Sequence, residues 1–318
     1  MSFSGMVKKE LSGYTERARH CCLAELSALI CACGSLEQDQ NGDSELLIRT
    51  ENEAILRKCF TLLKKTFNIK AVVLDERDIY TRRGKAYTGR IPGPEETIRV
   101  LEAVKVAYEL PAGPVGFDRS SLITQRDCCR RAYIRGAFLA SGSISDPEKG
   151  YHFEIVFPDE VRAQGVQAMI RSFGIDARIV LRKKTFVLYV KEGSQIVDLL
   201  GLMGADTALF DLENIRILKE MRNSVNRKVN CEAANINKTV SAAVKQIDDI
   251  RLIEKLKGLD SLSEGLTQVA RLRLQYPDAT LKELGCMLDP QVGKSGVNHR
   301  LRRLGELADE LREKEEEQ

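Results

Sequence analysis

Polar and basic side chains gather near the C-terminus in an order that suits recognition of double-stranded DNA. Asn298, His299 and Arg302 lie within one short stretch. In the major groove an asparagine side chain pairs with adenine and an arginine with guanine. Four more residues of this region complete the predicted DNA-binding set, and the basic ones are expected to bind phosphates: Lys294, Ser295, Arg300 and Arg303. The chain of 318 residues has a net charge of only +3, so this prediction depends on the local excess of positive charge.

A helix-turn-helix is predicted to present these side chains. Thr280 and Glu283 have the spacing of a capping box, which begins a helix that ends near Leu288. After a turn over residues 289–294, longer than is usual for this motif, Ser295 is expected to be the N-cap of the last helix. Its buried face is predicted from apolar residues at helical spacing, Val297, Leu301, Leu304 and Leu311. Asn298, His299 and Arg302 then point outward, although three arginines beside an acidic tail also fit an ordinary solvated face.

A second polar cluster lies in residues 222–239, within a stretch (207–257) that has no proline or glycine. This stretch is predicted to be helical, in two or three pieces, because its asparagines are mediocre helix formers. Its candidate DNA contacts are Arg227, Lys228, Asn235 and Lys238. Contact with phosphates or bases and a solvated face with caps between short helices are both consistent with these residue types.

Nine cysteines, none in Cys-x-x-Cys spacing, raise the question of a metal or redox site. His20, Cys21 and Cys22 lie at the start of one predicted helix (20–32) as Cys128 and Cys129 lie at the start of another (129–140), so these thiols could cluster as a sensor. Because the spacing fits no standard site, we favour reduced cysteines that pack between helices. On this interpretation the chain binds no metal and no cofactor.

The two helices that begin at these cysteines share a design. Ala24, Ala28 and Ala32 recur at intervals of four residues in the first, as do Ala132, Gly136 and Ala140 in the second. Two such smooth stripes can pack backbone to backbone. The order of predicted helices and strands after each is also the same, so an internal duplication is expected, with two αββαββα halves related by a pseudo-twofold axis. In the first half the prediction includes helices over 53–67 and 95–108, strands over 69–75 and ending at Pro92, and a connection over 111–116. Basic residues on the strands of the second half, Arg178, Arg182, Lys183 and Lys184, are consistent with a DNA surface or a protein surface.

Residues 26–34, LSALICACG, resemble the LAGLIDADG motif of homing endonucleases, and residues 134–142 are a looser copy. The resemblance implies that the two motif helices pack at the centre of a saddle of two sheets. It also implies that the residue before each final glycine should be an acid that binds the catalytic metal. Those residues are Cys33 and Ser141, and neither supplies the negatively charged oxygen that Mg²⁺ requires. We therefore predict that the fold is retained and the nuclease activity is lost. The alternative is a nuclease that binds its metal through the nearby acids Glu25, Asp39 or Asp146.

The whole chain resembles the WhiA family of bacterial regulators, most specifically in residues 26–36, 230–235 and 278–304. The resemblance implies a non-enzymatic DNA-binding protein that regulates transcription and is linked to cell division, chromosome segregation or sporulation. We expect an α+β fold: a LAGLIDADG-like domain of two halves (1–110 and 111–205), a helical linker (206–258) and an all-α helix-turn-helix domain (259–318). Expected partners are double-stranded DNA and, through the LAGLIDADG-like domain, proteins of the transcription machinery. The chain has no span of apolar residues that suits a membrane, so it is expected in the cytoplasm, on the nucleoid.

Overall fold

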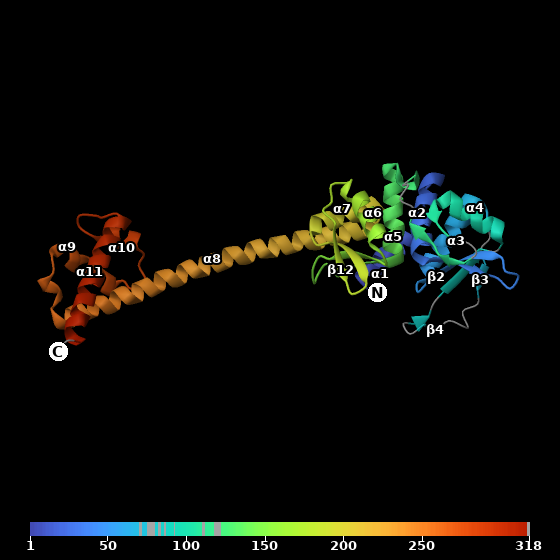
Figure 1. The fold of residues 1–318 in the computed structure, drawn as a ribbon. Coiled ribbons are helices and arrows are strands. Elements are labelled where there is room, and N and C mark those ends of the chain that lie inside the picture. Colours follow the sequence, from blue (N-terminus) through green and yellow to red (C-terminus); the bar gives the residue numbers. More distant parts are fainter. Residues whose placement is uncertain are drawn as a thin grey trace. The chain divides into compact units, whose positions relative to one another are not determined.

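Two helices with small residues on their facing sides lie side by side in the N-terminal part of the chain (Figure 1). They are α2 (Arg19–Cys33) and α5 (Asp127–Ser141) in a computed structural model that describes residues 1–69, 72–74, 80–81, 84–85, 87–91, 93–109, 112–117 and 122–316. A methyl group on Gly136 of α5 would lie 2.6 Å from the carbonyl oxygen of Glu25 and 2.9 Å from Cβ of Ala28. The predicted backbone-to-backbone packing is confirmed, and at Gly136 it leaves no room for a side chain.

Each of these helices begins a half with the same order of elements, apart from a separate pair of short strands, β4 and β5, in the first half. The first half continues with β1 (Gly34–Gln38), β2 (Ser44–Thr50), α3 (Glu53–Phe67), β3 (Val72–Leu74), β4 (Tyr80–Thr81), β5 (Gly84–Lys85), β6 (Tyr87–Ile91) and α4 (Pro94–Val104). The second continues with β10 (Gly142–Ile144), β11 (Phe153–Phe157), α6 (Glu160–Arg171), β12 (Arg178–Arg182), β13 (Thr185–Val190) and α7 (Gly193–Met203). Connecting elements are α1 (Phe3–Gly13), β7 (Val106–Ala107), β8 (Gly113–Pro114), β9 (Gly116–Phe117) and η1 (Leu122–Thr124).

The two antiparallel sheets have equivalent strand orders. The first is β3-β6-β2-β1-β8 and the second is β12-β13-β11-β10, so β8 is an addition at one edge of the first. One continuous apolar core joins both halves. The predicted pseudo-twofold αββαββα architecture is therefore confirmed.

Two details of the first half differ from the prediction. The helix expected over 95–108 is α4, which ends at Val104 because Lys105 takes a left-handed conformation with φ of 52°. The expected connection over 111–116 contains β8, which pairs with β1 through Gly113 and Pro114. Residues 70, 71 and 75 of the strand predicted over 69–75, Pro92 and Pro111 lie outside the described residues.

A buried ion cluster lies at the contact between α2 and α5. The carboxylate of Glu25 is 3.1 Å from Nη2 of Arg135 and 3.2 Å from Nζ of Lys58, and all three side chains are buried. Arg135 also contacts Glu16 at 3.2 Å and donates to the Met203 carbonyl at 2.9 Å. Buried charges are tolerated where each has a partner of opposite sign. Glu25 thus links Lys58 of the first half to Arg135 of the second.

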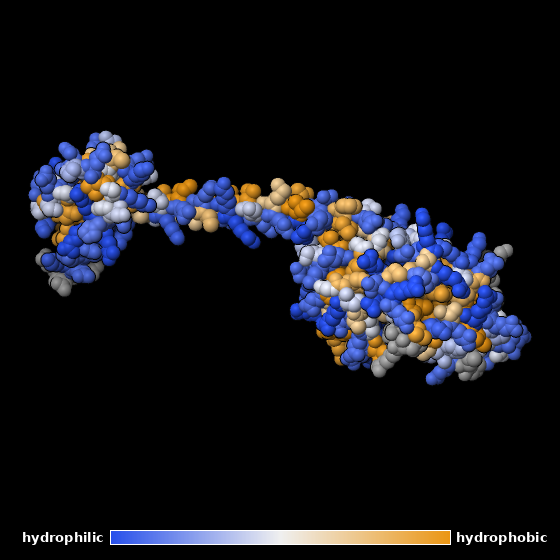
Figure 2. Space-filling model, turned by 90° about the horizontal axis from the view of Figure 1, so that it is seen from above, coloured by the Kyte–Doolittle hydropathy of each residue, from blue (hydrophilic) through white to orange (hydrophobic). Residues whose placement is uncertain are grey.

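Helix α8 (Asp206–Leu256) is one uninterrupted helix of 51 residues (Figure 1). The prediction of two or three pieces is wrong, because each asparagine costs a helix only a few tenths of a kcal/mol, roughly, relative to better helix formers. Apolar side chains remain exposed along it, as the space-filling view shows (Figure 2). Contacts divide the chain within this helix into units of residues 1–219 and 220–318. The domain boundaries given above stay predictions.

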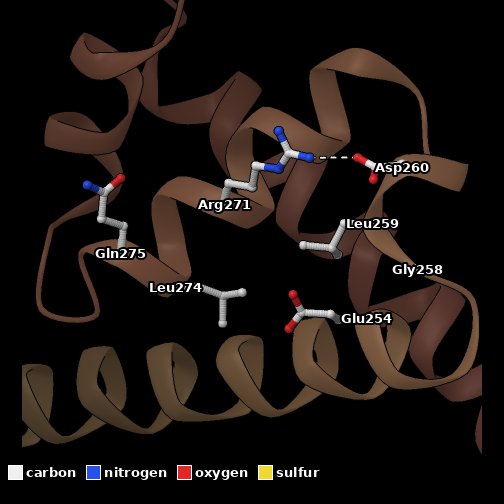
Figure 3. Close-up of a pocket in the computed structure, with 7 residues that line it drawn as sticks. All are labelled: Glu254, Gly258, Leu259, Asp260, Arg271, Leu274 and Gln275. Atoms are coloured by element: carbon white, nitrogen blue, oxygen red, sulfur yellow. Dashed lines mark hydrogen bonds and ion pairs between the residues drawn. The ribbon is translucent and has the colours of Figure 1, made fainter.

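The end of α8 packs with three shorter helices in the second unit. These are α9 (Glu264–Gln275), α10 (Leu281–Met287) and α11 (Lys294–Glu316), preceded by η2 (Leu259–Ser261). Their shared core includes Ile250 and Ile253 of α8, Leu284 of α10 and Leu301 of α11. A shallow pocket lies between α8 and α9, where Arg271 bridges to Asp260 at 2.6 Å (Figure 3). In the described part of the chain, none of the helices is long and apolar enough to cross a membrane.

Candidate nucleic-acid interface

The capping box fixes the start of α10 and thereby the turn that leads to α11. The backbone N–H of Thr280 donates to the Glu283 carboxylate at 2.7 Å, and the N–H of Glu283 donates to Oγ1 of Thr280 at 3.3 Å. The first of these bonds holds the pKa of Glu283 below its usual value. Next in the motif, the N–H of Val292 donates to the carbonyl of Gly285 at 3.0 Å. A methyl group on Gly285 would lie 2.1 Å from the Val292 carbonyl oxygen, so the turn packs directly on the α10 backbone.

Helix α11 presents its first turns as the sequence predicted. Val297 and Leu301 are buried, and Leu304 lies in the same core. Asn298, His299 and Arg302 are exposed on the opposite side. The arrangement matches a recognition helix, whose N-terminal residues meet base edges while the other face packs on the domain.

The start of α11 differs from the prediction by two residues. The helix begins at Lys294, and the carbonyl of Gly293 accepts hydrogen bonds from the N–H groups of Gly296 and Val297. Gly293 is therefore the N-cap, and Ser295 is an exposed residue of the first turn. Glycine is an acceptable N-cap residue, which explains why the serine is not needed for this role. Ser295 and Lys294 remain available to a ligand at the helix N-terminus.

The three arginines of α11 do not have equal access to a ligand. Arg300 is half-buried and its guanidinium donates to the Gly265 carbonyl of α9 at 3.4 Å, so it braces α11 against α9. Arg302 and Arg303 are exposed and share one acid, Glu306, at 3.4 and 2.9 Å. The hydrogen bond from Arg303 lowers the pKa of Glu306. Sequence analysis missed this acid, although its spacing of four residues from Arg302 is typical of a helical ion pair.

The four residues of α8 in the predicted set lie on one face of that helix. At 3.6 residues per turn Arg227, Lys228, Asn235 and Lys238 fall within an arc of about 100°. All four are exposed. The other side of α8 carries apolar side chains that are 55–62% exposed, namely Val225, Val229, Ile236 and Val240.

This basic face and the first turns of α11 are separate places in the second unit. Helix α8 joins the core of the unit at Asp249, whose carboxylate pairs with Arg312 of α11. Lys238 precedes Asp249 by eleven residues, a distance of about 17 Å along the helix axis. The structure thus brings each set of predicted residues together but does not merge the two sets.

The positions of the LAGLIDADG acids lie at the C-terminal ends of α2 and α5. Burial raises the pKa of Cys33 to about 11, so its thiol stays neutral. Ser141 donates to the Ala137 carbonyl at 3.5 Å. Two cationic side chains lie nearby. The charge of Lys8 partly offsets the effect of burial on the pKa of Cys33. Arg162 lines a small cavity with Ser141 and donates a hydrogen bond to the Cys31 carbonyl. A neutral thiol, a hydroxyl and two cationic side chains do not suit Mg²⁺.

The three other acids considered for a metal have structural partners. Glu25 belongs to the buried ion cluster. Asp39 accepts from the N–H groups of Asn41 and Asp43 at 2.8 Å each, in the hairpin between β1 and β2. Asp146 accepts from the N–H of Glu148 at 3.0 Å in the turn before β11. Each of these carboxylates is therefore engaged in a structural contact within the protein.

Comparison with known proteins agrees with this architecture from end to end. Residues 19–106 match the model of the WhiA N-terminal LAGLIDADG-like domain, residues 130–222 the WhiA LAGLIDADG-like domain and residues 225–308 the WhiA C-terminal HTH domain. The chain belongs to the WhiA family. The WhiA resemblance inferred from residues 26–36, 230–235 and 278–304 is thus confirmed.

Relatives within the WhiA family match over their whole length. A protein of Lachnoclostridium phytofermentans named probable cell division protein WhiA is 53% identical over 98% of this chain and 100% of its own. One of Lachnospira eligens with the same name is 49% identical, with 98% of each chain covered. The crystal structure of full-length WhiA from Thermotoga maritima matches with a TM-score of 0.57 and 24% identity, over 98% of this chain and 99% of that one. This last likeness shows that the two chains share a fold.

Proposed function

We propose that this WhiA-family chain is a non-enzymatic protein that binds double-stranded DNA in a sequence-specific way and regulates transcription. The observation that carries the proposal is the first part of α11, where Asn298, His299 and Arg302 are exposed above the buried Val297 and Leu301. The match to a WhiA HTH domain supports it. Its relatives are named probable cell division proteins, so we place the regulated genes in cell division. The resemblance to the WhiA family extends this proposal to chromosome segregation or sporulation, and the proposed DNA binding places the protein on the nucleoid.

In the proposed complex Arg302 exchanges a protein partner for a base. Its ion pair with Glu306 is exposed, and such pairs contribute roughly 0–1 kcal/mol. A bidentate contact from arginine to guanine discriminates against other bases by about 1–3 kcal/mol. The exchange is therefore favourable at a matching site and unfavourable elsewhere, which makes Glu306 a contributor to specificity.

The basic face of α8 supplies phosphate contacts in this proposal. Arg227, Lys228 and Lys238 share one side of an exposed helix, and asparagine at 235 adds a polar contact. Each phosphate neutralised should add about 0.9 to the slope of log affinity against log salt concentration. Such contacts carry no base preference, so they strengthen binding to all sequences alike.

The test begins with recovery of genomic DNA crosslinked to the full-length protein, which identifies its sites. Binding of one site and of a scrambled duplex is then measured over a series of salt concentrations. Arg302→Ala and Asn298→Ala should each lower the preference for the site by roughly 5–150-fold, the equivalent of about 1–3 kcal/mol. Arg57→Ala is the matched control, because Arg57 of α3 also pairs with a glutamate four residues away on the exposed side of its helix. An unchanged preference in the triple Asn298, His299 and Arg302 alanine variant contradicts the assignment of α11.

Two further experiments test the phosphate contacts of α8 and the absence of nuclease activity. A variant with alanine at Arg227, Lys228 and Lys238 should reduce the salt slope by up to about 2.7 and leave the preference for the site intact. Incubation of the identified site with the protein and Mg²⁺ or Mn²⁺ should leave the DNA uncut. Cleavage that a chelator abolishes would contradict the non-enzymatic proposal.

The surface around β12 supports a protein partner for the LAGLIDADG-like domain. Val180 and Leu181 are 47% and 61% exposed there, beside the exposed basic residues Arg182, Lys183 and Lys184. Exposed apolar side chains are typical of protein interfaces and contribute little to phosphate contact. A full-length variant with Leu181→Ser and Val180→Ser should keep its affinity for DNA and lose co-purification of the transcription machinery. Loss of DNA affinity instead would assign this surface to DNA.

A further inference from the structure

One imidazole and three thiols converge at the N-terminal ends of the central helix pair. His20 and Cys21 are the second and third residues of α2, and Cys128 and Cys129 are the second and third residues of α5. His20 precedes Cys128 by 108 residues, the same offset that separates Gly34 from Gly142 at the other ends of the helices. The four side chains are therefore equivalent in pairs across the pseudo-twofold axis. They lie at the opposite ends of α2 and α5 from Cys33 and Ser141.

Their donor atoms are spaced as one small ion requires. Nδ1 of His20 is 3.2 Å from Sγ of Cys129, 3.3 Å from Sγ of Cys21 and 3.9 Å from Sγ of Cys128. All four donor atoms lie within 4.8 Å of one another. Bond lengths of about 2.3 Å to sulfur and 2.0–2.1 Å to nitrogen in a tetrahedral zinc site separate its donor atoms by roughly 3.5–3.8 Å. Small side-chain rotations would bring the four atoms to those separations.

Burial raises the pKa of the Cys21 and Cys129 thiols, so the charge of a bound cation is needed to stabilise their thiolates. The ends of the two helices act in the same direction as that cation. Free N–H groups and the positive end of the helix dipole at the start of both α2 and α5 stabilise negative charge. Cys21 and Cys129 are buried against Ala24 and Ala132, whereas Cys128 is exposed and leaves a path for an ion. The exposed guanidinium of Arg126 lies 3.5 Å from Nε2 of His20. With Nδ1 as the ligand this nitrogen carries a hydrogen, so Arg126 must turn toward solvent while its charge still offsets the thiolates.

We propose that His20, Cys21, Cys128 and Cys129 bind one Zn²⁺ ion that joins the two halves of the LAGLIDADG-like domain. Nitrogen and sulfur donors select zinc over Mg²⁺ or Ca²⁺, and a complete set of four protein ligands is typical of a structural site. Binding transfers three thiol protons to solvent and uses the neutral imidazole. Iron–sulfur clusters spread their cysteine ligands over two or more iron atoms, so donors that converge on one point suit a single ion. The sequence analysis favoured packing because the ligands form two adjacent pairs with no standard spacing.

The full-length protein, purified without oxygen from cells grown with added zinc, should contain about one zinc per chain by elemental analysis. Replacement by Co²⁺ should give the visible absorption of tetrahedral cobalt bound to thiolate. Loss of a residue that only hydrogen-bonds to a metal ligand lowers metal affinity by roughly 10–100-fold. Cys128→Ser and His20→Ala remove ligands, so each should lower zinc affinity by more than this. The matched control is the double variant Cys231→Ser, Cys286→Ser, which removes two exposed thiols elsewhere and should keep the zinc.

Three outcomes would overturn the proposal. These are absence of zinc after loading with Zn²⁺ alone, full zinc content in Cys128→Ser, and equal zinc loss in the control variant. A disulfide between Cys21 and Cys129 in the freshly purified protein, found by peptide mapping, would assign the cluster to redox chemistry instead. Because Cys128 is exposed, its serine variant should fold, and circular dichroism verifies this. A chelator should then lower the melting temperature of the original protein and leave that of Cys128→Ser unchanged.

Discussion

The contact between α2 and α5 predicts a large effect from one added methyl group. In Gly136→Ala the new Cβ would lie 2.6 Å from the carbonyl oxygen of Glu25 and 2.9 Å from Cβ of Ala28. Neither neighbour can rotate away, because one is backbone and the other is bonded directly to it. Overpacking of this kind costs about 2–3 kcal/mol, at the upper end of the usual range. Alanine recovers about 1 kcal/mol through its better helix propensity. The net loss in the free energy of unfolding is then about 1–2 kcal/mol.

Calorimetry of the full-length protein measures this loss. For a unit of 219 residues each kcal/mol shifts the melting temperature by about 2–4 °C, so a fall of roughly 2–8 °C is expected for the N-terminal unit. The transition of the C-terminal unit should not move. Gly201→Ala is the control, since a methyl group there would meet only the flexible end of Leu209, at 3.1 Å, and should be neutral or stabilising. If Gly136→Ala melts at or above the temperature of the original protein, the close packing of α5 on α2 at this glycine is refuted.

Three further changes test the second unit. Gly285→Ala places a methyl group 2.1 Å from the Val292 carbonyl oxygen and should cost about 3 kcal/mol or more, lowering the melting temperature of that unit by roughly 12 °C or more in calorimetry. Thr280→Ala removes the cap of α10 and should cost about 1 kcal/mol by chemical denaturation; no change would show that the cap is not formed. Glu283 has a pKa held below its ordinary value of 4.5, so the unfolded chain binds its proton more tightly. Its contribution to stability is present above pH 4.5 and lost as the pH falls through the lowered pKa, and Glu283→Gln should flatten this acid dependence.

The parts of the fold that sequence predicted are those set by local patterns. The helix expected over residues 53–67 is α3 (Glu53–Phe67), since Asn52 caps it and apolar residues repeat along it. The capping box at Thr280 and the buried stripe of α11 also follow from short spacings, and the structure has both. Small residues at intervals of four likewise indicated the packing of α2 on α5, because a groove without side chains is a local property of each helix.

The parts that sequence did not predict depend on residues far apart or on competition between weak terms. Helix α8 is continuous because the small helix-propensity costs of its asparagines are together too small to interrupt it. The residue type at any one position does not show this. The N-cap of α11 is Gly293 and not Ser295. Both residue types are acceptable at an N-cap, so the packing of the turn decides which one is used. The convergence of His20 with Cys129 requires the register of two helices that are more than a hundred residues apart. Adjacent pairs of ligands give no spacing from which that register could be worked out.

The two ends of the α2 and α5 pair differ in a way that follows from the helix dipole. The C-terminal ends, which carry partial negative charge, have Lys8 and Arg162 nearby, while the N-terminal ends bring together thiols that can become anions. Gly136 lies about 11–12 Å along α5 from Cys128, so the helix separation that it permits also sets the distance between the two pairs of ligands. Gly136→Ala should therefore weaken zinc binding as well as stability, when measured by competition with a chelator at a temperature at which the variant is folded. Gly201→Ala should leave zinc affinity unchanged. Zinc affinity in Gly136→Ala equal to that of the original protein would show that the ligands adjust independently of the helix contact.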